Sequence, residues 1–314
     1  MSKVLILGGA GFIGSNLAES LCLDHEVTVV DGLLNQTGGA AAHLEDLTNR
    51  IKFIPSRIEQ VPNLTTLLAD HSIVVDSMAW TSHLSAMEHP SYDLELNQTS
   101  HLFFIEALKS VPGKKIIYLG SRSQYGNLDS SEITEETKQE PVDIQGTHKT
   151  ATESYYRILS KSRSLDTLSL RIPNTFGSNQ PTKGPDIGLV GSMIRDALNG
   201  KEIEIFGTDR YRHLLYVGEL CKIIQAFLAR DWKGFEPFNV AGHRMRINDL
   251  AELIVELAGS GRCSVREMPE KVRAVDAGSA LFSDGKLRKV LNTVTETPIR
   301  DSLAETIRYF RGKL

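Results

Sequence analysis

One glycine-rich segment near the start of the chain constrains its fold more than any other feature. The segment Gly8–Gly14, with the sequence GGAGFIG, follows the apolar run Val4–Leu7 and precedes a stretch with helical spacing that reaches about Leu23. Glycines at such a strand-to-helix turn let the backbone turn tightly and approach a pyrophosphate, and the helix N-terminus presents unpaired N–H groups. The segment therefore predicts a dinucleotide-binding turn after a buried first strand, with a purely structural glycine turn as the alternative.

An acidic residue at the end of the next apolar run indicates which dinucleotide is expected. Asp31 follows the run Glu26–Val30, which reads as a second strand. There its carboxylate would accept hydrogen bonds from the adenosine ribose hydroxyls and would repel a 2′-phosphate. No Arg or Lys lies between Gly32 and His43 to bind such a phosphate. NAD is therefore the expected cofactor rather than NADP, and a helix-cap or turn role for Asp31 is the alternative.

Short apolar runs alternate with stretches of helical spacing over the first half of the chain. After the first two runs, the strand candidates are residues 52–54, 73–75, 115–119 and 167–171, and residues 102–108 form one of the helical stretches between them. Strands that alternate with helices imply a parallel sheet covered on both faces. The expected fold is α/β, a Rossmann-like doubly wound parallel sheet with a smaller C-terminal substrate-binding region.

The alternation breaks down from Pro173 onward, where proline and glycine become frequent. We therefore predict an NAD-binding domain over residues 1–172, which also receives about residues 209–238. The substrate-binding region would take residues 173–208 and 239–314. Its helices are expected near residues 189–198, 247–257 and 299–310.

Composition excludes several functional classes. The 314 residues carry a formal net charge of -4, so no basic excess exists to neutralise nucleic-acid phosphates. No apolar run approaches the length of a membrane span. The three cysteines, Cys22, Cys221 and Cys263, are too widely spaced to suggest a disulfide framework or a metal site. We expect a cytoplasmic protein that binds no metal, no nucleic acid and no membrane.

Several later motifs, taken in order, identify a family. The glycine spacing GxxGxxG at Gly8, Gly11 and Gly14 is joined by seven further landmarks: Asn97, the segment Leu119–Gly126 (LGSRSQYG), the helix positions Gly146, Lys149 and Glu153, the segment Arg171–Gly177 (RIPNTFG), Arg212, the segment Phe238–Gly242 (FNVAG), and the segment Arg273–Asp276. In this order they resemble the extended short-chain dehydrogenases/reductases, and specifically the NAD-dependent nucleotide-sugar epimerases and dehydratases. The resemblance covers nearly the whole chain.

The resemblance implies an enzyme that transfers a hydride between a sugar ring carbon, usually C4, and the nicotinamide of NAD. Ser121 would bind the reacting hydroxyl, and Lys149 would bind the nicotinamide ribose and lower the pKa of a neighbouring base. The implied cofactor-binding residues are Gly8, Gly11, Phe12, Ile13, Gly14, Asp31, Arg57, Ile58, Ala79, Asn97 and Lys149. The implied substrate-binding residues are His83, Ser121, Asn174, Arg212 and Arg273.

Of these substrate residues, Asn174, Arg212 and Arg273 would hold the diphosphate of a nucleotide sugar, because guanidinium groups meet two phosphate oxygens at once. A surface ion pair for either arginine, or a turn role for Asn174, is the alternative. The resemblance also implies a homodimer through the helices that carry Asn97 and Lys149. The apolar residues 102–105 are available for this contact, although the sheet could bury some of them.

The catalytic tyrosine of the family is missing. Gln145 stands in its place, four residues before Lys149, in the segment DIQGTHK. A carboxamide only donates and accepts hydrogen bonds, so the usual general base is absent. The expected replacements are, in order, Lys149 or a bound water, then His148, which lies three residues along the same helix, and then His83 in the loop after the fourth strand.

Three other features depart from the family pattern. Arg122 and Ser123 stand where the 4,6-dehydratases have an Asp-Glu pair, which argues against a standard dehydratase. Arg57 replaces an aspartate that faces the adenine, so the adenine contacts would differ. Asp76 interrupts an apolar segment, and a carboxylate at the end of a buried strand needs a partner. We expect a structural hydrogen bond there.

These observations lead to one principal hypothesis and two alternatives. The principal hypothesis is NAD-dependent oxidation or epimerisation of a nucleotide-activated sugar by an atypical site. A non-catalytic protein that binds NAD and a sugar nucleotide, for example in polysaccharide assembly, is the first alternative. A dehydratase with a relocated base is the second.

Overall fold

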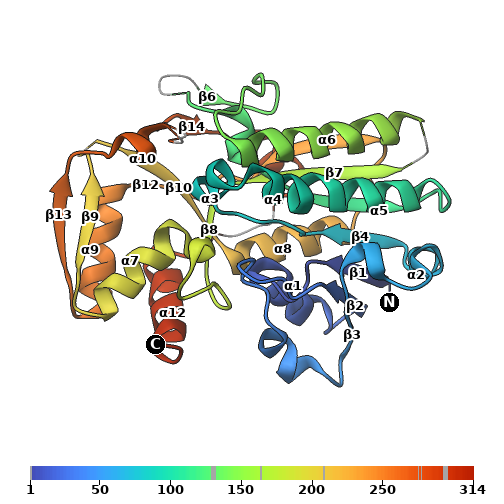
Figure 1. Ribbon diagram of the computed structural model, residues 1–314, viewed down its shortest axis with the longest axis horizontal. Coiled ribbons are helices and arrows are strands. Elements are labelled where there is room, and N and C mark those ends of the chain that lie inside the picture. Colours follow the sequence, from blue (N-terminus) through green and yellow to red (C-terminus); the bar gives the residue numbers. More distant parts are fainter. Residues whose placement is uncertain are drawn as a thin grey trace.

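The strand before the glycine turn lies inside a seven-stranded parallel sheet, and this confirms the predicted fold class (Figure 1). The computed structural model describes residues 2–128, 132–162, 165–207, 209–274, 276, 278–292 and 296–314. The strand order is β11-β7-β5-β4-β1-β2-β3. The strands are β1 (Lys3–Leu7), β2 (Glu26–Asp31), β3 (Ile51–Pro55), β4 (Ile73–Asp76), β5 (Lys115–Ser121), β7 (Asp166–Ile172) and β11 (Phe235–Asn239).

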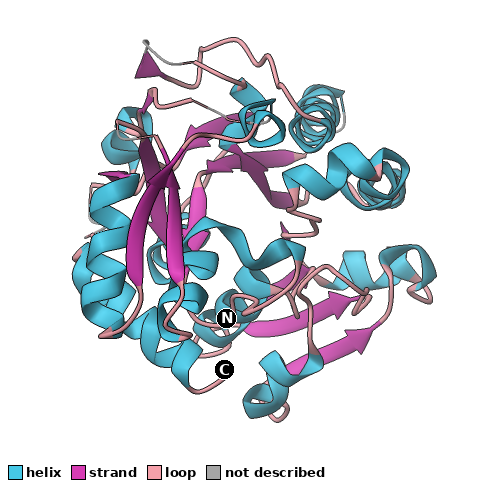
Figure 2. Ribbon diagram, turned by 60° about the vertical axis from the view of Figure 1, so that its left-hand side comes forward, coloured by secondary structure: helices cyan, strands magenta, loops and turns pink. Residues whose placement is uncertain are grey.

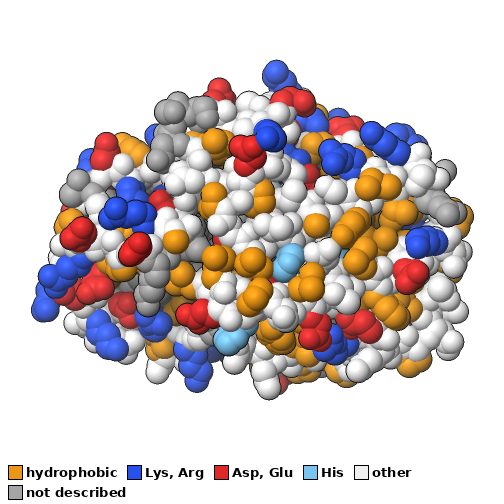
Figure 3. Space-filling model, turned by 45° about the horizontal axis from the view of Figure 1, so that its top comes forward, with side chains coloured by type: hydrophobic (Ala, Val, Ile, Leu, Met, Phe, Trp, Pro, Cys, Tyr) orange, Lys and Arg blue, Asp and Glu red, His pale blue; other side chains and the backbone are white. Residues whose placement is uncertain are grey.

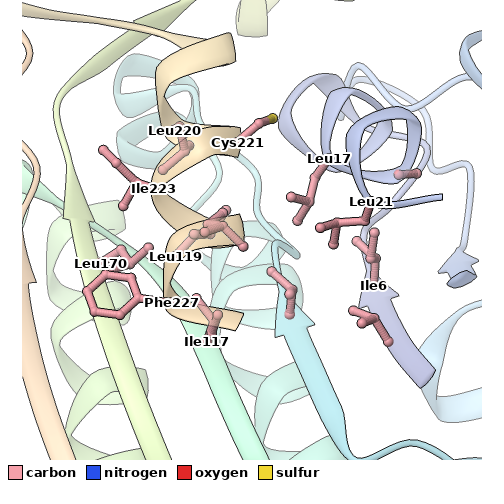
Figure 4. Close-up of a cluster of buried hydrophobic side chains, with 14 of the residues drawn as sticks. Ile6, Leu17, Leu21, Ile117, Leu119, Leu170, Leu220, Cys221, Ile223 and Phe227 are labelled. Carbon is pink, nitrogen blue, oxygen red and sulfur yellow. The ribbon is translucent and has the colours of Figure 1, made fainter. Parts of the chain in front are cut away.

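Helices cover both faces of this sheet, as parallel strands require. On one face lie α1 (Phe12–Leu21), α8 (Val217–Leu228) and α11 (Gly285–Val290). Their apolar side chains pack on the sheet in one core, in which Figure 4 shows Leu17 of α1 and Leu220 of α8. Leu287 of α11 belongs to the same core. The other face holds a second core, formed with α2 (Leu64–Asp70), α5 (Ser100–Leu108) and α6 (Ile144–Ser162).

The strand β11 was not expected from the sequence. It contains Pro237, which lacks a backbone N–H and reads as a break in a strand pattern. The structure places it at the edge of the sheet, where β7 is its one neighbour. Val240 N donates to Arg171 O, and neighbouring residues alternate in direction, so the nitrogen of Pro237 faces away from the sheet. The missing donor therefore costs no ladder hydrogen bond.

The C-terminal part has its own core and small sheets (Figure 2). Helices α7 (Gly188–Leu198), α9 (Ile247–Ala258) and α12 (Ile299–Arg311) contribute to this core. One small sheet has the order β12-β10-β8, and two strand pairs, β13–β9 and β14–β6, complete the set. These strands are β6 (Glu132–Ile133), β8 (Asn174–Phe176), β9 (Glu202–Phe206), β10 (Tyr211–Tyr216), β12 (His243–Arg246), β13 (Arg262–Arg266) and β14 (Leu281–Phe282).

The remaining helices are short and lie near the sheet's C-terminal edge or on the surface. They are α3 (His83–Glu88), α4 (Pro90–Leu94) and α10 (Glu270–Ala274). Single turns of 3-10 helix occur at Ile58–Gln60 (η2), Arg122–Tyr125 (η4) and Pro185–Ile187 (η5), a longer one runs over Ala41–Leu47 (η1), and a π-helical turn runs over Glu95–Thr99 (η3). None of the helices in the described ranges is long and apolar enough to span a bilayer.

Candidate active site

A cavity of about 560 Å³ opens where the carboxyl ends of the central strands meet the C-terminal part. This volume lies in the range of small-molecule and cofactor sites. Most of the predicted site residues line it: Gly8, Gly11, Phe12, Ile13, Gly14, Asp31, Arg57, Ile58, Ala79, His83, Ser121, Gln145, Lys149, Asn174 and Arg212. Asn97, His148 and Arg273 are not among the described residues of its wall.

The glycine turn provides a close backbone cradle at this cavity. Gly8 has a φ of +72°, and a Cβ at this position would lie 2.9 Å from Met78 N. A Cβ on Gly14 would lie 2.4 Å from Gly8 O. Helix α1 starts after Gly11 with no side-chain cap on its N-terminal N–H groups. These uncapped donors and the space kept by glycine fit a pyrophosphate.

Asp31 lies beside this turn, at the end of β2. Its carboxylate accepts hydrogen bonds from Ala10 N at 2.9 Å and from Leu33 N at 2.8 Å. Burial raises the pKa of the carboxyl, and these backbone donors lower it in part. Because the two donors fix the carboxylate on the cavity wall, it can receive the hydroxyls of an adenosine ribose.

The structure brings a cation to this end of the cavity that the sequence near Asp31 did not reveal. The Cγ of Arg57 would lie 2.9 Å from a Cβ on Gly32. Its guanidinium pairs with Glu59 at 3.2 Å and with Glu95 at 2.6 Å. Two carboxylates therefore offset the charge that could otherwise attract a 2′-phosphate.

Lys149 is buried on the first turns of α6. Its Nζ donates to Leu119 O at 3.0 Å and to Met78 O at 3.4 Å, and lies 5.1 Å from the centre of the Tyr118 ring. Burial lowers the pKa of this amine to about 8, against the opposing charges of Asp76 and Asp93. The ammonium is thus held at the ends of β4 and β5, on the wall of the cavity.

Ser121 and Gln145 are joined through Ser123. Ser121 ends β5, and its Oγ accepts from Ser123 N at 3.1 Å and contacts Ser123 Oγ at 2.8 Å. Ser123 Oγ donates to Gln145 Oε1 at 3.4 Å, and Gln145 Nε2 donates to Trp80 O at 3.2 Å. The Gln145 carboxamide, only 3% exposed, is therefore fixed at both of its polar atoms.

The two histidines proposed as replacement bases lie in different places. His148 Nδ1 lies 2.6 Å from Asp93 Oδ1, and its side chain is directed to α4 rather than to the cavity. His83, the first residue of α3, lines the cavity, and its Nδ1 lies 2.9 Å from Asp143 Oδ2. Asp143 also lines the cavity and was not identified from the sequence, although it precedes Gln145 by two residues.

Asn97 supports the cavity from behind. It lies in the π-helical turn, fully buried, and its amide donates to Trp80 O and to Asp93 Oδ2, both at 2.8 Å. Its Oδ1 accepts from Trp80 N at 3.0 Å. Asn97 thereby fixes the backbone between β4 and α3, the segment that leads to His83.

The far side of the cavity carries arginine and asparagine. Arg212 and Arg210 both pair with Asp276, and Arg212 Nη1 also donates to Gly278 O at 2.9 Å. Asn174 Nδ2 donates to His213 O at 3.4 Å. Arg273 is exposed on α10, three residues before Asp276, and away from the described wall.

The expected partner of Asp76 is present. Its Oδ2 accepts from Tyr156 OH at 2.6 Å and lies 2.7 Å from His101 Nδ1, and all three side chains are fully buried. Burial raises the pKa of this carboxyl, but the charge and hydrogen bond of His101 outweigh burial and hold the pKa below its usual value. Asp76 is therefore satisfied inside the fold.

Comparison with known proteins finds relatives that act on sugar nucleotides. A model of the NAD dependent epimerase/dehydratase family matches residues 4–241. A UDP-glucose 4-epimerase of Mycolicibacterium smegmatis is 26% identical over 99% of each chain. A dTDP-glucose 4,6-dehydratase of Streptomyces niveus is 24% identical over 98% of this chain and 93% of its own. Among solved structures, a UDP-N-acetylglucosamine 4-epimerase from Methanobrevibacter ruminantium M1, in complex with UDP-N-acetylmuramic acid, superposes with a TM-score of 0.89 at 26% identity, covering 100% of this chain and 99% of that one.

Proposed function

Because this chain belongs to the NAD-dependent epimerase/dehydratase family, we propose that it oxidises a nucleotide-activated sugar at a ring carbon, C4, and acts as an epimerase. One observation carries the proposal: a single cavity holds the glycine turn, the pair Ser121 and Lys149, and Arg212. Two relatives named above are 4-epimerases of UDP-sugars, which supports both the nucleotide-sugar class and the carbon.

The residues would divide the work as follows. Asp31 and the glycine turn hold NAD, which supplies the oxidising power when bound. Lys149 donates to the nicotinamide ribose, and Ser121 donates to the oxygen on the reacting carbon. Asn174 and Arg212 bind the diphosphate. For this, part of the Arg212 guanidinium exchanges its contact with Asp276 for contacts with phosphate oxygens.

A second candidate is a protein that binds NAD and a sugar nucleotide without turnover. It is favoured by Gln145, whose carboxamide is hydrogen-bonded at both of its polar atoms and cannot act as a general acid or base. A dehydratase is disfavoured, because Arg122 and Ser123 provide no carboxyl group beside Ser121.

We also propose the division of labour along the chain. Residues 1–172 with about 209–238 would bind NAD, and residues 173–208 and 239–314 would bind the sugar nucleotide. Support comes from α8 and β11, which pack into the large sheet, and from the separate core of α7, α9 and α12. Strand β10 connects the two parts of the chain, since it pairs with β8 and β12 of the C-terminal part and leads into α8 on the large sheet.

The proposed function is tested by single-turnover reduction of NAD by UDP- and dTDP-sugars in the wild type, Gln145→Tyr and Lys149→Met. If the protein is an enzyme, the wild type should reduce NAD, and Lys149→Met should not. Reduction only in Gln145→Tyr would support a binding protein that has lost its base, because a positioned base is worth typically 10²–10⁴-fold in rate. Full activity of Lys149→Met would contradict the assigned site.

A further inference from the structure

The pair formed by His83 and Asp143 has the geometry of an oriented base on the cavity wall. We propose that His83, oriented by Asp143, is the proton acceptor for the sugar hydroxyl and replaces the missing tyrosine. This inference rests on the proposed oxidation of a nucleotide sugar. It adds a catalytic residue and a positioning residue to that site.

Asp143 is a fixed partner. It is the residue before α6, and its Oδ1 accepts from Gly146 N at 2.7 Å, as an N-cap does. Its Oδ2 lies 2.9 Å from His83 Nδ1, and its side chain is only 2% exposed. A buried carboxylate that also caps a helix has little freedom to rotate, so the imidazole bound to it keeps one orientation.

The hydrogen bond to Asp143 also assigns the tautomer of His83. In the neutral ring, Nδ1 donates to the carboxylate, and Nε2 is left as the acceptor. Among the described residues, Nε2 has no hydrogen-bond partner, and the side chain is 39% exposed at the cavity. The proton-accepting atom is therefore available to a ligand.

Two links place this imidazole beside the position of the missing tyrosine. Asp143 immediately precedes α6, and Gln145 is the second residue of that helix. Gln145 Nε2 also donates to Trp80 O, three residues before His83. Ser82 Oγ caps α3 by accepting from Ser85 N at 3.3 Å, which fixes the first residue of that helix. His83, Gln145 and Ser121 all line the same cavity.

The proton step is balanced by groups of this chain. The sugar O–H bond breaks, an N–H bond forms at Nε2, and the imidazolium charge is offset by Asp143. A second carboxylate, Asp186 of η5, faces the same cavity. Burial has the largest effect on the pKa of this carboxyl and raises it to about 6, while hydrogen bonds from Thr81 and Ser82 and the charge of His83 act in the opposite direction. Two acids from different elements thus stabilise the charged ring.

Lys149 is the weaker candidate for this step. Its Nζ is already bonded to Leu119 O and Met78 O, and with a pKa of about 8 it carries its proton at neutral pH. His148 is excluded by its contact with Asp93, outside the cavity. Gln145 has no basic atom. Histidine as a residue type exchanges protons near neutral pH, which suits the task.

The test compares wild type with His83→Gln, Asp143→Asn and, as a matched control, His89→Gln, which changes an exposed histidine just after α3. The assay is single-turnover reduction of NAD by UDP-glucose and dTDP-glucose over a range of pH, with calorimetry of both ligands. His83→Gln should be about 10²–10⁴-fold slower, with ligand affinity within about threefold of wild type. His89→Gln should match the wild type.

A second readout addresses the positioning role of Asp143. Asp143→Asn keeps a side chain that can cap α6 but removes the charge beside His83, so it should slow the reduction while the affinity for NAD and for the sugar nucleotide stays within about threefold of wild type. A merely structural role of Asp143 would weaken binding of both ligands as well.

The outcomes separate two failures. Reduction by wild type that persists within about twofold in His83→Gln would overturn the assignment of His83 and leave the proposed function intact. A reduction rate in Asp143→Asn within about twofold of wild type would overturn the orienting role of the carboxylate. No reduction by wild type with either sugar would overturn the proposed function and this inference with it.

Discussion

Glu153 is a buried carboxylate whose removal should destabilise the whole domain. It lies on α6 and accepts hydrogen bonds from Arg171 Nε at 2.9 Å, from Ser169 Oγ at 2.6 Å and from Gln124 Nε2 at 3.0 Å. The ion pair with Arg171 is 5% exposed on both sides. Substitution Glu153→Leu would therefore leave a guanidinium buried without its counter-charge.

Removal of one partner from a buried ion pair costs about 3–5 kcal/mol, because the remaining charge stays desolvated. We expect Glu153→Leu to lower the free energy of unfolding by this amount, which is a large share of the usual 5–15 kcal/mol. Replacement of both partners by apolar groups is often close to neutral. The double variant Glu153→Leu/Arg171→Met should therefore recover most of the loss.

Urea unfolding at neutral pH measures these differences. The control is Glu256→Leu, which removes the acid of an exposed ion pair with Arg300 and should change stability little. A loss below about 1 kcal/mol in Glu153→Leu, or additive effects in the double variant, would refute the role given to the buried pair.

The same substitution has an expected pH dependence. Burial raises the pKa of Glu153, but the hydrogen bonds and charge of Arg171 outweigh burial and hold the pKa below its usual value. The carboxylate is then stabilising above the pKa of the unfolded chain, and this stabilisation is lost as the pH falls through the folded pKa. The difference between wild type and Glu153→Leu should shrink under acidic conditions.

Three further predictions concern the cofactor, the buried lysine and assembly. Calorimetry should show that NAD binds at least about tenfold tighter than NADP, and Asp31→Ala should reduce this difference in affinity. Equal affinities in the wild type would contradict the role of Asp31. Burial lowers the pKa of Lys149 from 10.5 to about 8, so between these pH values the unfolded chain binds this proton more firmly than the folded protein does. The free energy of unfolding should therefore rise from pH 8 to 10.5 relative to Lys149→Met, by about 3 kcal/mol in total. Parallel slopes in the two proteins would argue against a buried amine. Light scattering should report a dimer formed over the face of α5 and α6, where Figure 3 shows hydrophobic side chains gathered. On this face Phe103 is 43% exposed and Ile158 is 59% exposed. Phe103→Asp should yield monomers, and a monomeric wild type at micromolar concentration would reject the contact.

The sequence was most informative where a residue type has one physical use. The apolar runs located six of the seven strands of the main sheet, because fully buried parallel strands are apolar on both faces. Gly8 and Gly14 were expected at the first turn and Asp31 at the end of the second strand, since close backbone approach and a ribose acceptor leave few alternatives. The strand β11 was missed, because Pro237 is compatible only with an edge, and edges follow from topology.

Directions of side chains were harder to predict. Gln145 and His148 are three residues apart, which suggested that both lie on one face of α6. Consecutive helix residues such as His148 and Lys149, however, point in directions about 100° apart, so His148 need not face the cavity that Lys149 lines. Asp93 of α4 then fixes His148 away from the cavity. Likewise, two of the four apolar residues offered for a dimer, Phe104 and Ile105, pack into the sheet. Only the packed neighbours decide such cases.

The pairing of His83 with Asp143 lay outside the reach of the sequence for a related reason. Sixty residues separate the two side chains, and nothing local marks an aspartate before a helix as more than a cap. Their contact depends on α3 meeting the start of α6. The one signal in the sequence is that Asp143 stands two residues before Gln145, which replaces the tyrosine.

Both outer strands of the seven-stranded sheet contain a proline, and this affects how the protein behaves at high concentration. An unpaired strand edge is a template for pairing with another chain, and proline withholds the donor that such pairing needs. On β11 the outward nitrogen of Pro237 cannot donate, and Asn239 N is already bonded to Glu135 Oε1 at 2.7 Å. On β3, Pro55 closes the strand. The prolines thereby shorten the stretch of each outer strand that could pair edge to edge with another chain.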